Sequence, residues 1–420
     1  MNATPNLTER LPRSWFWLPA ILGILTSLTG TGGTGTNTQA LSVASTWQLP
    51  VEVKATCFAL SPDAGSLALM HTNGYVEIWG TAARLPQRRI AVQTLPITSF
   101  FRQSLAFSPD GQWLAILSGG PLRLVPVSGA TNELLVGDAR DSVTHIKFSA
   151  DSRHVLVCGK AEYVVSLPEG KPVGTLTTSG TSVPKLTPHR PLARFGKPSR
   201  PIRTSTSALS PDGSEVALGQ EHLEVERWDV ASGQCLGYAS LDVTGMPLEQ
   251  SPVSVLNYSS RNKQLVAVLN GSQWDVVLVE PDGKWRTLLH QTPWGQLQTS
   301  PRRAIIDAFF TPDGREVVVL AEKLAEDKPG SPFVRAVGPE VLFLDSVTGA
   351  VTRRLDSAEA CFFGQAWISA DGLQLTLLRR HYSKVPRTFA EWNRLRTDHA
   401  DLAAALLTVS LDREPKPGNP

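Results

Sequence analysis

The sequence predicts an all-β protein, a β-propeller built from seven copies of one unit of short strands. Three observations predict it. A short turn motif, Ser-Pro-Asp-Gly or a close variant, occurs seven times, and successive copies lie 41 to 61 residues apart. Apolar runs of strand length stand on both sides of each copy, and a period of this size made of strands and turns is typical of propeller blades. The copies lie at Leu60–Asp63, Ala106–Gly111, Phe148–Asp151, Leu209–Gly213, Tyr258–Asn262, Phe310–Gly314 and Ile368–Gly372.

The turn motif has a physical basis, which is clearest at Ser108-Pro109-Asp110-Gly111. Proline sets φ at the first corner, the aspartate side chain bonds to nearby backbone, and glycine takes the left-handed position. The flanking runs at 104–107 and 113–117 have the length of strands. Two such runs joined by a tight turn predict a hairpin.

The repeated motif resembles the turn between the first two strands of WD40-type propeller blades, and this resemblance extends over residues 41–413. It implies the propeller fold and says little about function, because one fold serves many functions. The sequence departs from eukaryotic WD40 proteins because it has no Gly-His dipeptide. Aspartate is also mostly missing from the turn between the second and third strands, so we expect the buried Asp–His network of that family to be missing. The chain is most similar to degenerate, bacterial-style propellers.

In such a blade, strands a to d run from the central axis outward. Blade one is predicted at 56–60, 66–70, 75–79 and 90–95, and blade two at 104–107, 113–117, 122–127 and 133–136. Blade three is predicted at 144–148, 154–158, 163–167 and 173–177, and blade four at 206–209, 215–218, 223–229 and 235–241. Blade five is predicted at 254–258, 264–269, 275–280 and 285–289, and blade six at 305–310, 316–321, 341–345 and 351–355. Blade seven is predicted at 362–368, 373–378 and 406–411.

Blade seven therefore lacks one strand, and the alternating segment Leu41–Leu49 is the candidate to supply it. Pairing the first and last segments closes the ring and removes exposed sheet edges.

The N-terminus has the pattern of an export segment. Arg10 and Arg13 precede an apolar run from Trp15 to Leu25, which Pro19 interrupts. The run is shorter than the roughly 20 residues that a membrane-spanning helix needs. We therefore interpret residues 1–40 as a signal peptide, or an N-terminal membrane anchor, followed by a Thr/Gly-rich linker, with small residues at Thr38-Gln39-Ala40 where a signal peptidase could cut.

This predicts a periplasmic or secreted protein, the alternative being a membrane-anchored chain with an exported propeller. No cysteine follows the apolar run, which argues against a lipoprotein anchor. The formal net charge of +2 gives no bulk attraction to nucleic acid. A disordered tail is expected at 414–420.

The four cysteines form no CxxC or CxxCH motif, which excludes c-type haem and the usual zinc motifs. Cys57 and Cys361 belong to the first and last blades, so a disulfide between them is conceivable. Their different distances from the turn favour buried thiols instead.

Four long insertions, at 178–205, 290–304, 322–340 and 379–405, interrupt the repeats. All of them are connections between strands b and c or between strand d and the next strand a, which leave a propeller on the same face. Together they carry a formal charge of +10, although the whole chain carries +2. This asymmetry predicts a basic face with functional loops.

Three alternatives concern the insertions themselves. The basic loops are solvated without a partner, or the Pro-rich first insertion is disordered. The fourth insertion has capping-box spacing at Thr388 and Glu391, followed by apolar residues at helical spacing. That predicts a helix that packs on the propeller rim or presents a face to a partner. Its apolar stripe is Phe389, Trp392, Leu395, His399 and Leu402.

Candidate chemistry is restricted to the innermost strands. Four residues before the turn serine or threonine, six of seven positions are polar, thiol or ionisable, and His145 and Asp307 are the candidates for metal binding or proton transfer near the channel. The favoured interpretation is a small polar position between blades. We find no phosphate-binding loop, catalytic Ser-His-Asp order or metal-spaced histidine cluster, and predict no cofactor, metal site or catalytic residue. The positions are Cys57, Ser104, His145, Thr206, Val255, Asp307 and Gln365.

The sequence thus predicts an exported propeller that acts as a protein-interaction or scaffolding module. Its partner is expected to be a protein with an acidic surface or an anionic envelope polymer, with membrane contact only through an uncleaved N-terminal segment. The alternative is an enzyme, since lactonases and quinoprotein-type dehydrogenases use similar propellers with chemistry near the axis. The predicted partner-binding residues are Arg190, Arg194, Lys197, Arg200, Arg203, Trp294, Arg379, Arg380, Trp392, Arg394 and Arg396.

Overall fold

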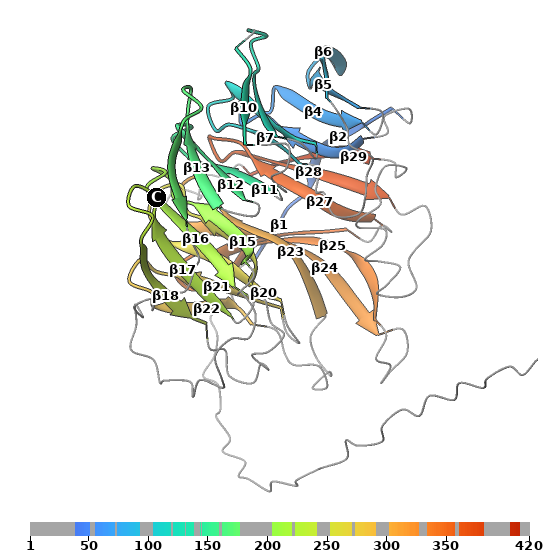
Figure 1. Ribbon diagram of the computed structural model, residues 1–420. Helices are drawn as coiled ribbons and strands as arrows, with labels where there is room; N and C mark the ends of the chain where they lie inside the picture. Colours follow the sequence, from blue (N-terminus) through green and yellow to red (C-terminus); the bar gives the residue numbers. More distant parts are fainter. Residues whose placement is uncertain are drawn as a thin grey trace, which may run out of the picture. The chain divides into compact units, whose positions relative to one another are not determined.

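The structure is a computed structural model in which seven antiparallel sheets form a seven-bladed β-propeller (Figure 1). It describes residues 38–50, 55–71, 74–92, 104–118, 121–130, 132–137, 143, 145–158, 162–176, 204–220, 223–241, 253–270, 274–290, 302–326, 334–357, 361–381 and 404–411. Among these residues there is no helix long and apolar enough to cross a membrane. The helix predicted in the fourth insertion lies outside them.

The first four blades each consist of four consecutive strands, from strand a to strand d. Blade one is β3 (Ala55–Leu60), β4 (Ser66–His71), β5 (Tyr75–Gly80) and β6 (Leu85–Ala91). Blade two is β7 (Ser104–Phe107), β8 (Trp113–Leu117), β9 (Leu122–Pro126) and β10 (Leu134–Val136). Blade three is β11 (His145–Phe148), β12 (His154–Cys158), β13 (Glu162–Ser166) and β14 (Pro172–Leu176). Blade four is β15 (Thr204–Leu209), β16 (Glu215–Gln220), β17 (Glu224–Asp229) and β18 (Cys235–Ser240).

The last three blades follow the same order, and the final one is completed from the N-terminal side. Blade five is β19 (Val253–Tyr258), β20 (Leu265–Asn270), β21 (Trp274–Val279) and β22 (Trp285–Leu289). Blade six is β23 (Arg302–Phe310), β24 (Glu316–Glu326), β25 (Val334–Asp345) and β26 (Val351–Asp356), with β1 (Gln39–Ala40) added in parallel to β26. Blade seven is β27 (Cys361–Ile368), β28 (Gln374–His381) and β29 (Ala404–Ser410), with β2 (Val43–Gln48) as its outer strand. The predicted closure by an N-terminal strand is confirmed, since β2 pairs antiparallel with β29.

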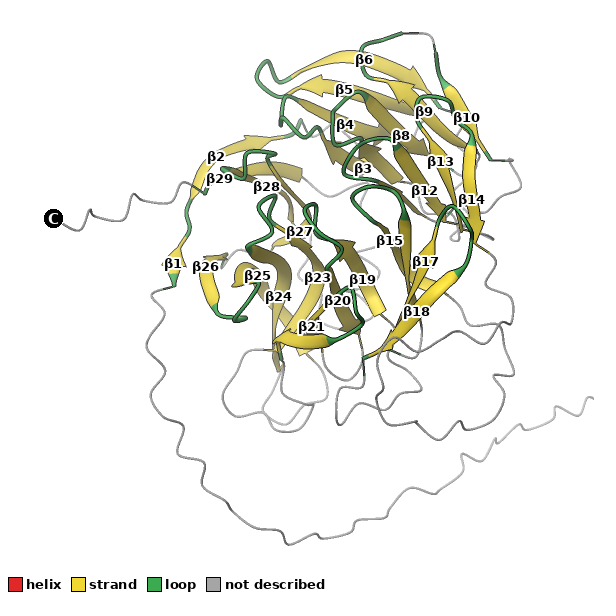
Figure 2. Cartoon of the chain, turned by 90° about the vertical axis from the view of Figure 1, so that its left-hand side faces the viewer, coloured by secondary structure: helices red, strands yellow, loops and turns green. Residues whose placement is uncertain are grey.

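The hydrophobic core lies between the blades. Each of seven buried clusters joins two adjacent sheets, as where Val76 of blade one packs with Leu114 of blade two. One cluster contains Leu378 of blade seven together with Leu60 of blade one, so the last interface closes the ring. Figure 2 shows the innermost strands β3, β15, β19, β23 and β27 gathered around a common centre. Seven interfaces for seven blades leave no blade with an uncovered face.

The repeated turn has the predicted geometry. The Ser108 hydroxyl donates to Asp110 at 2.5 Å, and that carboxylate accepts the backbone N–H of Gln112 at 3.0 Å. The hydroxyl oxygen also accepts the N–H of Trp113 at 2.9 Å, which starts strand b, and Gly111 has φ of 72°. The same pattern recurs at the turns that begin with Ser61, Ser149, Ser210, Thr311 and Ser369.

Strand boundaries differ from the prediction at two polar segments. Strand β6 begins at Leu85 instead of 90; the prediction missed residues 85–89 because they are mostly exposed and lack apolar alternation. In blade six, β24 continues to Glu326 and β25 starts at Val334, so much of the predicted insertion at 322–340 is strand. In blade six, pairing between charged side chains such as Arg303 and Glu340 allows polar residues to be buried, which an apolar pattern does not reveal.

None of the four cysteines, all of which lie within the described residues, forms a disulfide. Cys158 and Cys361 are buried, whereas Cys57 and Cys235 are partly buried. The disulfide considered between Cys57 and Cys361 is therefore not formed, and the predicted buried thiol is confirmed for Cys361, whereas Cys57 is only partly buried.

Candidate functional site

Two hydrogen-bonded groups of polar side chains lie on the innermost strands, where the sequence placed its channel candidates. The first joins blades three and four. His145 of β11 has its Nε2 at 2.6 Å from the Ser207 hydroxyl of β15, and that hydroxyl lies 2.8 Å from the Cys158 thiol of β12. Ser207 is fully buried. The arrangement brings a histidine, a hydroxyl and a thiol together, and the hydroxyl between the other two has no contact with solvent.

The chemistry of this first group is set by burial. Burial raises the pKa of the Cys158 thiol to about 12, which the hydrogen bond with Ser207 only partly offsets. A thiol with such a pKa is protonated at neutral pH and is a poor nucleophile. The group therefore fits a structural contact between two blades better than a nucleophile with its base.

The second group joins blades three, five and six. Lys147 of β11 donates to the Asn257 side-chain oxygen of β19 at 2.9 Å. The Asn257 amide donates to the Ala308 carbonyl of β23 at 2.8 Å and lies 3.4 Å from the Asp307 carboxylate. Blades three and five are separated by blade four. Their side chains can meet only on the channel side, so the Lys147–Asn257 bond crosses the channel.

The Asp307 carboxylate is the acidic member of this second group. It accepts the backbone N–H of Ala308 at 2.8 Å. Burial raises the pKa of Asp307, and the nearby Lys147 ammonium offsets part of that rise. A carboxylate in this environment is held by fixed donors and one cation, which stabilises the inner strands against one another.

His145 and Asp307 are thus both on innermost strands, as predicted, and each is held by a different set of neighbours. His145 contacts the Ser207 hydroxyl of blade four, whereas the Asp307 carboxylate contacts the Asn257 amide and the backbone N–H of Ala308. Sequence reasoning missed Lys147, Ser207 and Asn257. The sequence signal that could have revealed this second group was Lys147 itself. It stands two residues before the turn serine, a position at which blades one, two and four have alanine. In the part of the chain that the structure describes, no group of three metal-binding side chains is present.

Single carboxylate–imidazole pairs occur in two blades, although the Asp–His network of WD40 proteins was expected to be missing. In blade five, the buried Asp275 lies 3.2 Å from His290, which follows the outer strand. In blade one, the buried Glu77 lies 3.1 Å from His71 and accepts the indole N–H of Trp79 at 3.0 Å. Burial lowers the pKa of His71, although Glu77 acts in the opposite direction. Carboxylate–imidazole pairs therefore persist without the Gly-His dipeptide.

The face that bears the insertions is defined by strand order. Apart from the added N-terminal strands β1 and β2, the strands of every blade run antiparallel in sequence order, so strand b and strand d end on the side where strand a begins. We call this side the insertion face. The strand ends that flank residues 177–203, 291–301, 327–333 and 382–403 all lie on it. The opposite face carries the a–b and c–d turns.

Most of the predicted partner-binding residues lie outside the described residues, and only the pair in β28 is described. Arg379 is partly buried, and Arg380 is 3% exposed with its guanidinium 4.8 Å from the Phe58 ring centroid. Burial lowers the pKa of Arg380 to about 10. Arg380 packs between blades seven and one, so its assignment to an open binding surface is corrected. The residues outside are Arg190, Arg194, Lys197, Arg200, Arg203, Trp294, Trp392, Arg394 and Arg396.

Some of the positive charge assigned to the insertions is paired within blade six. Arg303 forms an ion pair with the fully buried Glu340, which also lies 3.1 Å from Arg354. Lys323 lies 3.1 Å from Asp356. These charges hold the extended strands of blade six together, and the surplus on the insertion face must come from the other insertions.

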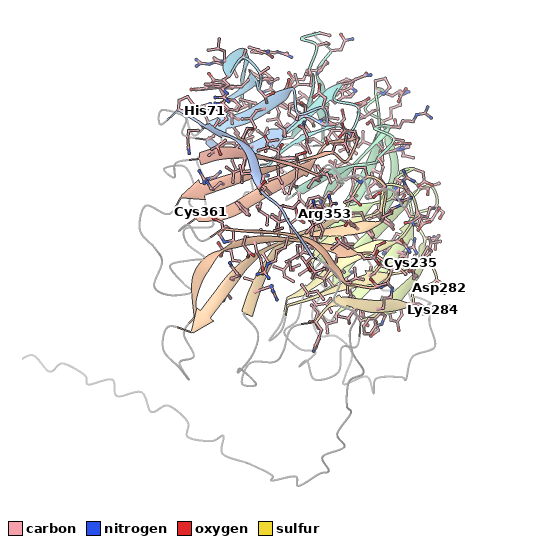
Figure 3. All side chains as sticks on the ribbon, turned by 180° about the vertical axis from the view of Figure 1, so that it is seen from behind. His71, Cys235, Asp282, Lys284, Arg353 and Cys361 are labelled. Carbon is pink, nitrogen blue, oxygen red and sulfur yellow. The ribbon has the colours of Figure 1, made fainter. Side chains whose placement is uncertain are left out.

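The opposite face is built from short turns that contact one another. Asp110 N–H of the blade-two turn donates to the Ser152 hydroxyl of blade three at 2.9 Å, and Asp151 N–H donates to the Pro211 carbonyl of blade four at 3.0 Å. Arg261 of blade five donates to the Pro312 carbonyl of blade six at 3.2 Å. An exposed ion pair, Lys284 with Asp282 at 2.6 Å, marks the c–d turn of blade five (Figure 3).

Comparison with known proteins supports the fold and leaves the function open. No family model matches the chain, and no curated protein matches it. Among solved structures, the chain is similar to the β-propeller domain of Cps50 (Swd1) from Myceliophteria thermophila, with a TM-score of 0.54 and 14% identity. The match covers 79% of this chain and 96% of that one. At this identity the likeness shows the WD40-type propeller fold alone.

Proposed function

We propose that the chain is an exported β-propeller that acts as an interaction or scaffolding module and binds its partner through the insertion face. One observation carries the proposal: the described strand order brings both ends of all four insertions to one side of a closed ring. Loops of this kind on a rigid scaffold are the usual location of binding residues. The N-terminal pattern of Arg10, Arg13 and the apolar run supports export.

The charge of the insertions favours an acidic partner. The first insertion carries six basic residues and no acidic one, and the fourth carries six against three. A cluster of one sign attracts a surface of the opposite sign and speeds its association. The partner is therefore a protein with an acidic surface or an anionic envelope polymer.

The inner-strand groups favour binding over catalysis. Ser207 is fully buried, the Cys158 thiol has a raised pKa, and Asp307 is held by Asn257 and backbone. An enzyme needs reacting groups that a substrate can reach within hydrogen-bond distance. The alternative of a lactonase-like or quinoprotein-dehydrogenase-like enzyme retains His145 and Asp307 as its candidates, but the described contacts offer it no accessible nucleophile.

The test is a pull-down from envelope extract with the mature chain and two variants. The first variant changes Arg190, Arg194, Lys197 and Arg200 to serine. The matched control changes four exposed basic residues on the opposite face to serine: Arg153, Lys171, Lys284 and Arg315. Both variants lose the same formal charge, so they separate a local effect from a change in net charge.

We expect the first variant to lose the partner, the control to keep it, and high salt to weaken binding in the unchanged chain, since exposed charges are screened by salt. Equal loss in both variants would show that only net charge matters. A partner that is indifferent to the first variant and to salt would contradict the insertion face as the binding surface.

A further inference from the structure

The segment Thr38–Leu49 crosses the outer rim of three blades. On blade six, the Thr38 hydroxyl donates to the Val351 carbonyl at 3.2 Å. Strand β1 then pairs in parallel with β26, and Leu41 N–H donates to the Arg354 carbonyl at 2.7 Å. The outer edge of blade six is therefore covered where β1 lies, as Figure 2 shows beside β26.

Beyond β1 the same segment enters two interfaces in turn. Leu41 packs against the cluster between blades six and seven. Strand β2 pairs with β29, which places Trp47 opposite Leu406. Trp47 and Leu49 are buried in the cluster between blades seven and one, and the Trp47 ring lies 6.3 Å from that of Trp79. One continuous segment thus holds blades six, seven and one together.

The edge strand that receives β1 is itself firmly held. Arg353 of β26 is 7% exposed, forms an ion pair with Glu316 and lies 4.1 Å over the Phe343 ring (Figure 3). Its guanidinium also donates to the Leu411 carbonyl at 3.3 Å, which ties β26 to the end of blade seven. A buried, paired arginine at this place keeps the acceptor carbonyls of β26 in position for β1.

This arrangement bears on how the N-terminal segment is processed. The small residues Thr38-Gln39-Ala40, where a signal peptidase could cut, coincide with β1. Cleavage after Ala40 would remove Thr38 and both residues of β1 from blade six.

We propose that the segment Thr38–Leu49 remains in the mature protein as a strap that closes blades six, seven and one, so that any processing cut lies N-terminal to Thr38. The position of the cut rests on the proposed export; the strap itself does not. The strap also supplies the outermost strand of both blades, because β2 is the fourth strand of blade seven and β1 adds a short fifth strand to blade six.

The first measurement is the intact mass of the exported protein. The expected mature chain begins after the apolar run, which ends at Leu25, and no later than Thr38. A mature chain that begins at Gln39 or later would overturn the proposed position of the cut while leaving export intact. If the full-length chain stays in the cytosol, export itself fails, and the strap is then decided by the second measurement alone.

The second measurement is hydrogen–deuterium exchange on purified chains that start at Thr38, Leu41 or Pro50. Starting at Leu41 is expected to speed exchange in β26, which loses β1, and to leave β29 protected. Starting at Pro50 is expected to speed exchange in β29 as well, because β2 is lost. Equal exchange in β26 for the first two chains would overturn the strap.

A point variant keeps the test independent of truncation. Leu41→Pro removes the N–H that donates to the Arg354 carbonyl, so exchange in β26 should rise. Ala44→Ser is the matched control, because Ala44 is exposed and lies at the register shift of β2, outside its pairs with β29. Equal behaviour of the two variants would contradict the strap.

Discussion

At the scale of single residues, the channel-side contact between Lys147 and Asn257 is the least expected feature. A lysine on an innermost strand places a charge where blades one, two and four have alanine. The structure compensates for it with the Asn257 oxygen and the Asp307 carboxylate nearby. Such a group is stabilising only when all its members are present, because a single buried charge without a partner is costly.

The pKa of Asp307 leads to a testable pH dependence. Because burial raises this pKa in the folded state, the contribution of Asp307 to stability is fully present below its ordinary pKa of 3.8 and is lost as pH rises through the folded value. The unfolding free energy of Asp307→Asn, measured relative to that of the unchanged chain, should therefore be higher at about pH 7.5 than at about pH 4.5. Urea unfolding at the two pH values measures this.

Lys147→Met serves as the opposing variant in the same experiment. It removes the cation that offsets the Asp307 charge, so it should destabilise the fold by about 1–3 kcal/mol, and by more at the higher pH. The double variant should lose that pH dependence. An effect of Lys147→Met that is the same at both pH values would contradict the coupling between the two residues.

At the scale of elements, the a–b turn is the repeated unit that the sequence specifies most fully. Its left-handed position is filled by glycine in four turns, at φ near 70°, and by Ala64 and Ser152 in two others. The two exceptions show that the hydrogen bonds of the serine and aspartate hold the turn even when the backbone is strained. Ser152 gains a compensating contact, because its hydroxyl accepts the Asp110 N–H.

Two glycine variants separate backbone strain from steric collision. Gly111→Ala places a methyl group no closer than 3.8 Å to Pro62, so it should cost only the strain of a left-handed alanine, about 1 kcal/mol. Gly213→Ala has the same φ of 72°, but its methyl group would collide with the His154 ring. We expect a clearly larger loss of unfolding free energy for Gly213→Ala. Equal losses in urea unfolding would show that His154 moves aside at little cost.

At the scale of the whole molecule, stability depends on closure of the ring. Every blade packs against two neighbours, and arginines reinforce several of these interfaces. Arg88 of blade one donates to the Pro126 carbonyl of blade two at 2.7 Å, and Arg227 of blade four donates to the Pro281 carbonyl of blade five at 2.6 Å. The closing interface instead depends on Trp47 and Leu49 from the N-terminal segment.

Trp47→Ala tests that dependence. Removing a buried tryptophan from a core costs about 3–5 kcal/mol, and here the loss falls on the interface between blades seven and one. We expect a lower midpoint of thermal unfolding than in Leu85→Ala, the control, since Leu85 is 63% exposed on an outer strand. Equal midpoints for the two variants would mean that closure contributes little to stability.

The sequence by itself determined the number of blades, most strand positions and the turn chemistry. These depend on local rules: a proline, an aspartate and a glycine at fixed spacing, with apolar alternation on either side. It also predicted that an N-terminal strand would complete blade seven, because a count of strands left one missing. It failed at Leu85–Arg89 and in the extended strands of blade six, where polar residues are strand because of their partners.

Only the tertiary structure decided which polar residues meet. Lys147, Ser207 and Asn257 lie in different repeats, and no spacing along the chain shows that they reach His145 and Asp307 across blades. The same holds for Arg380, whose charge suggested a surface residue but whose position beside Phe58 buries it. Contacts between repeats depend on how the ring closes, and closure brings together residues that are far apart in sequence.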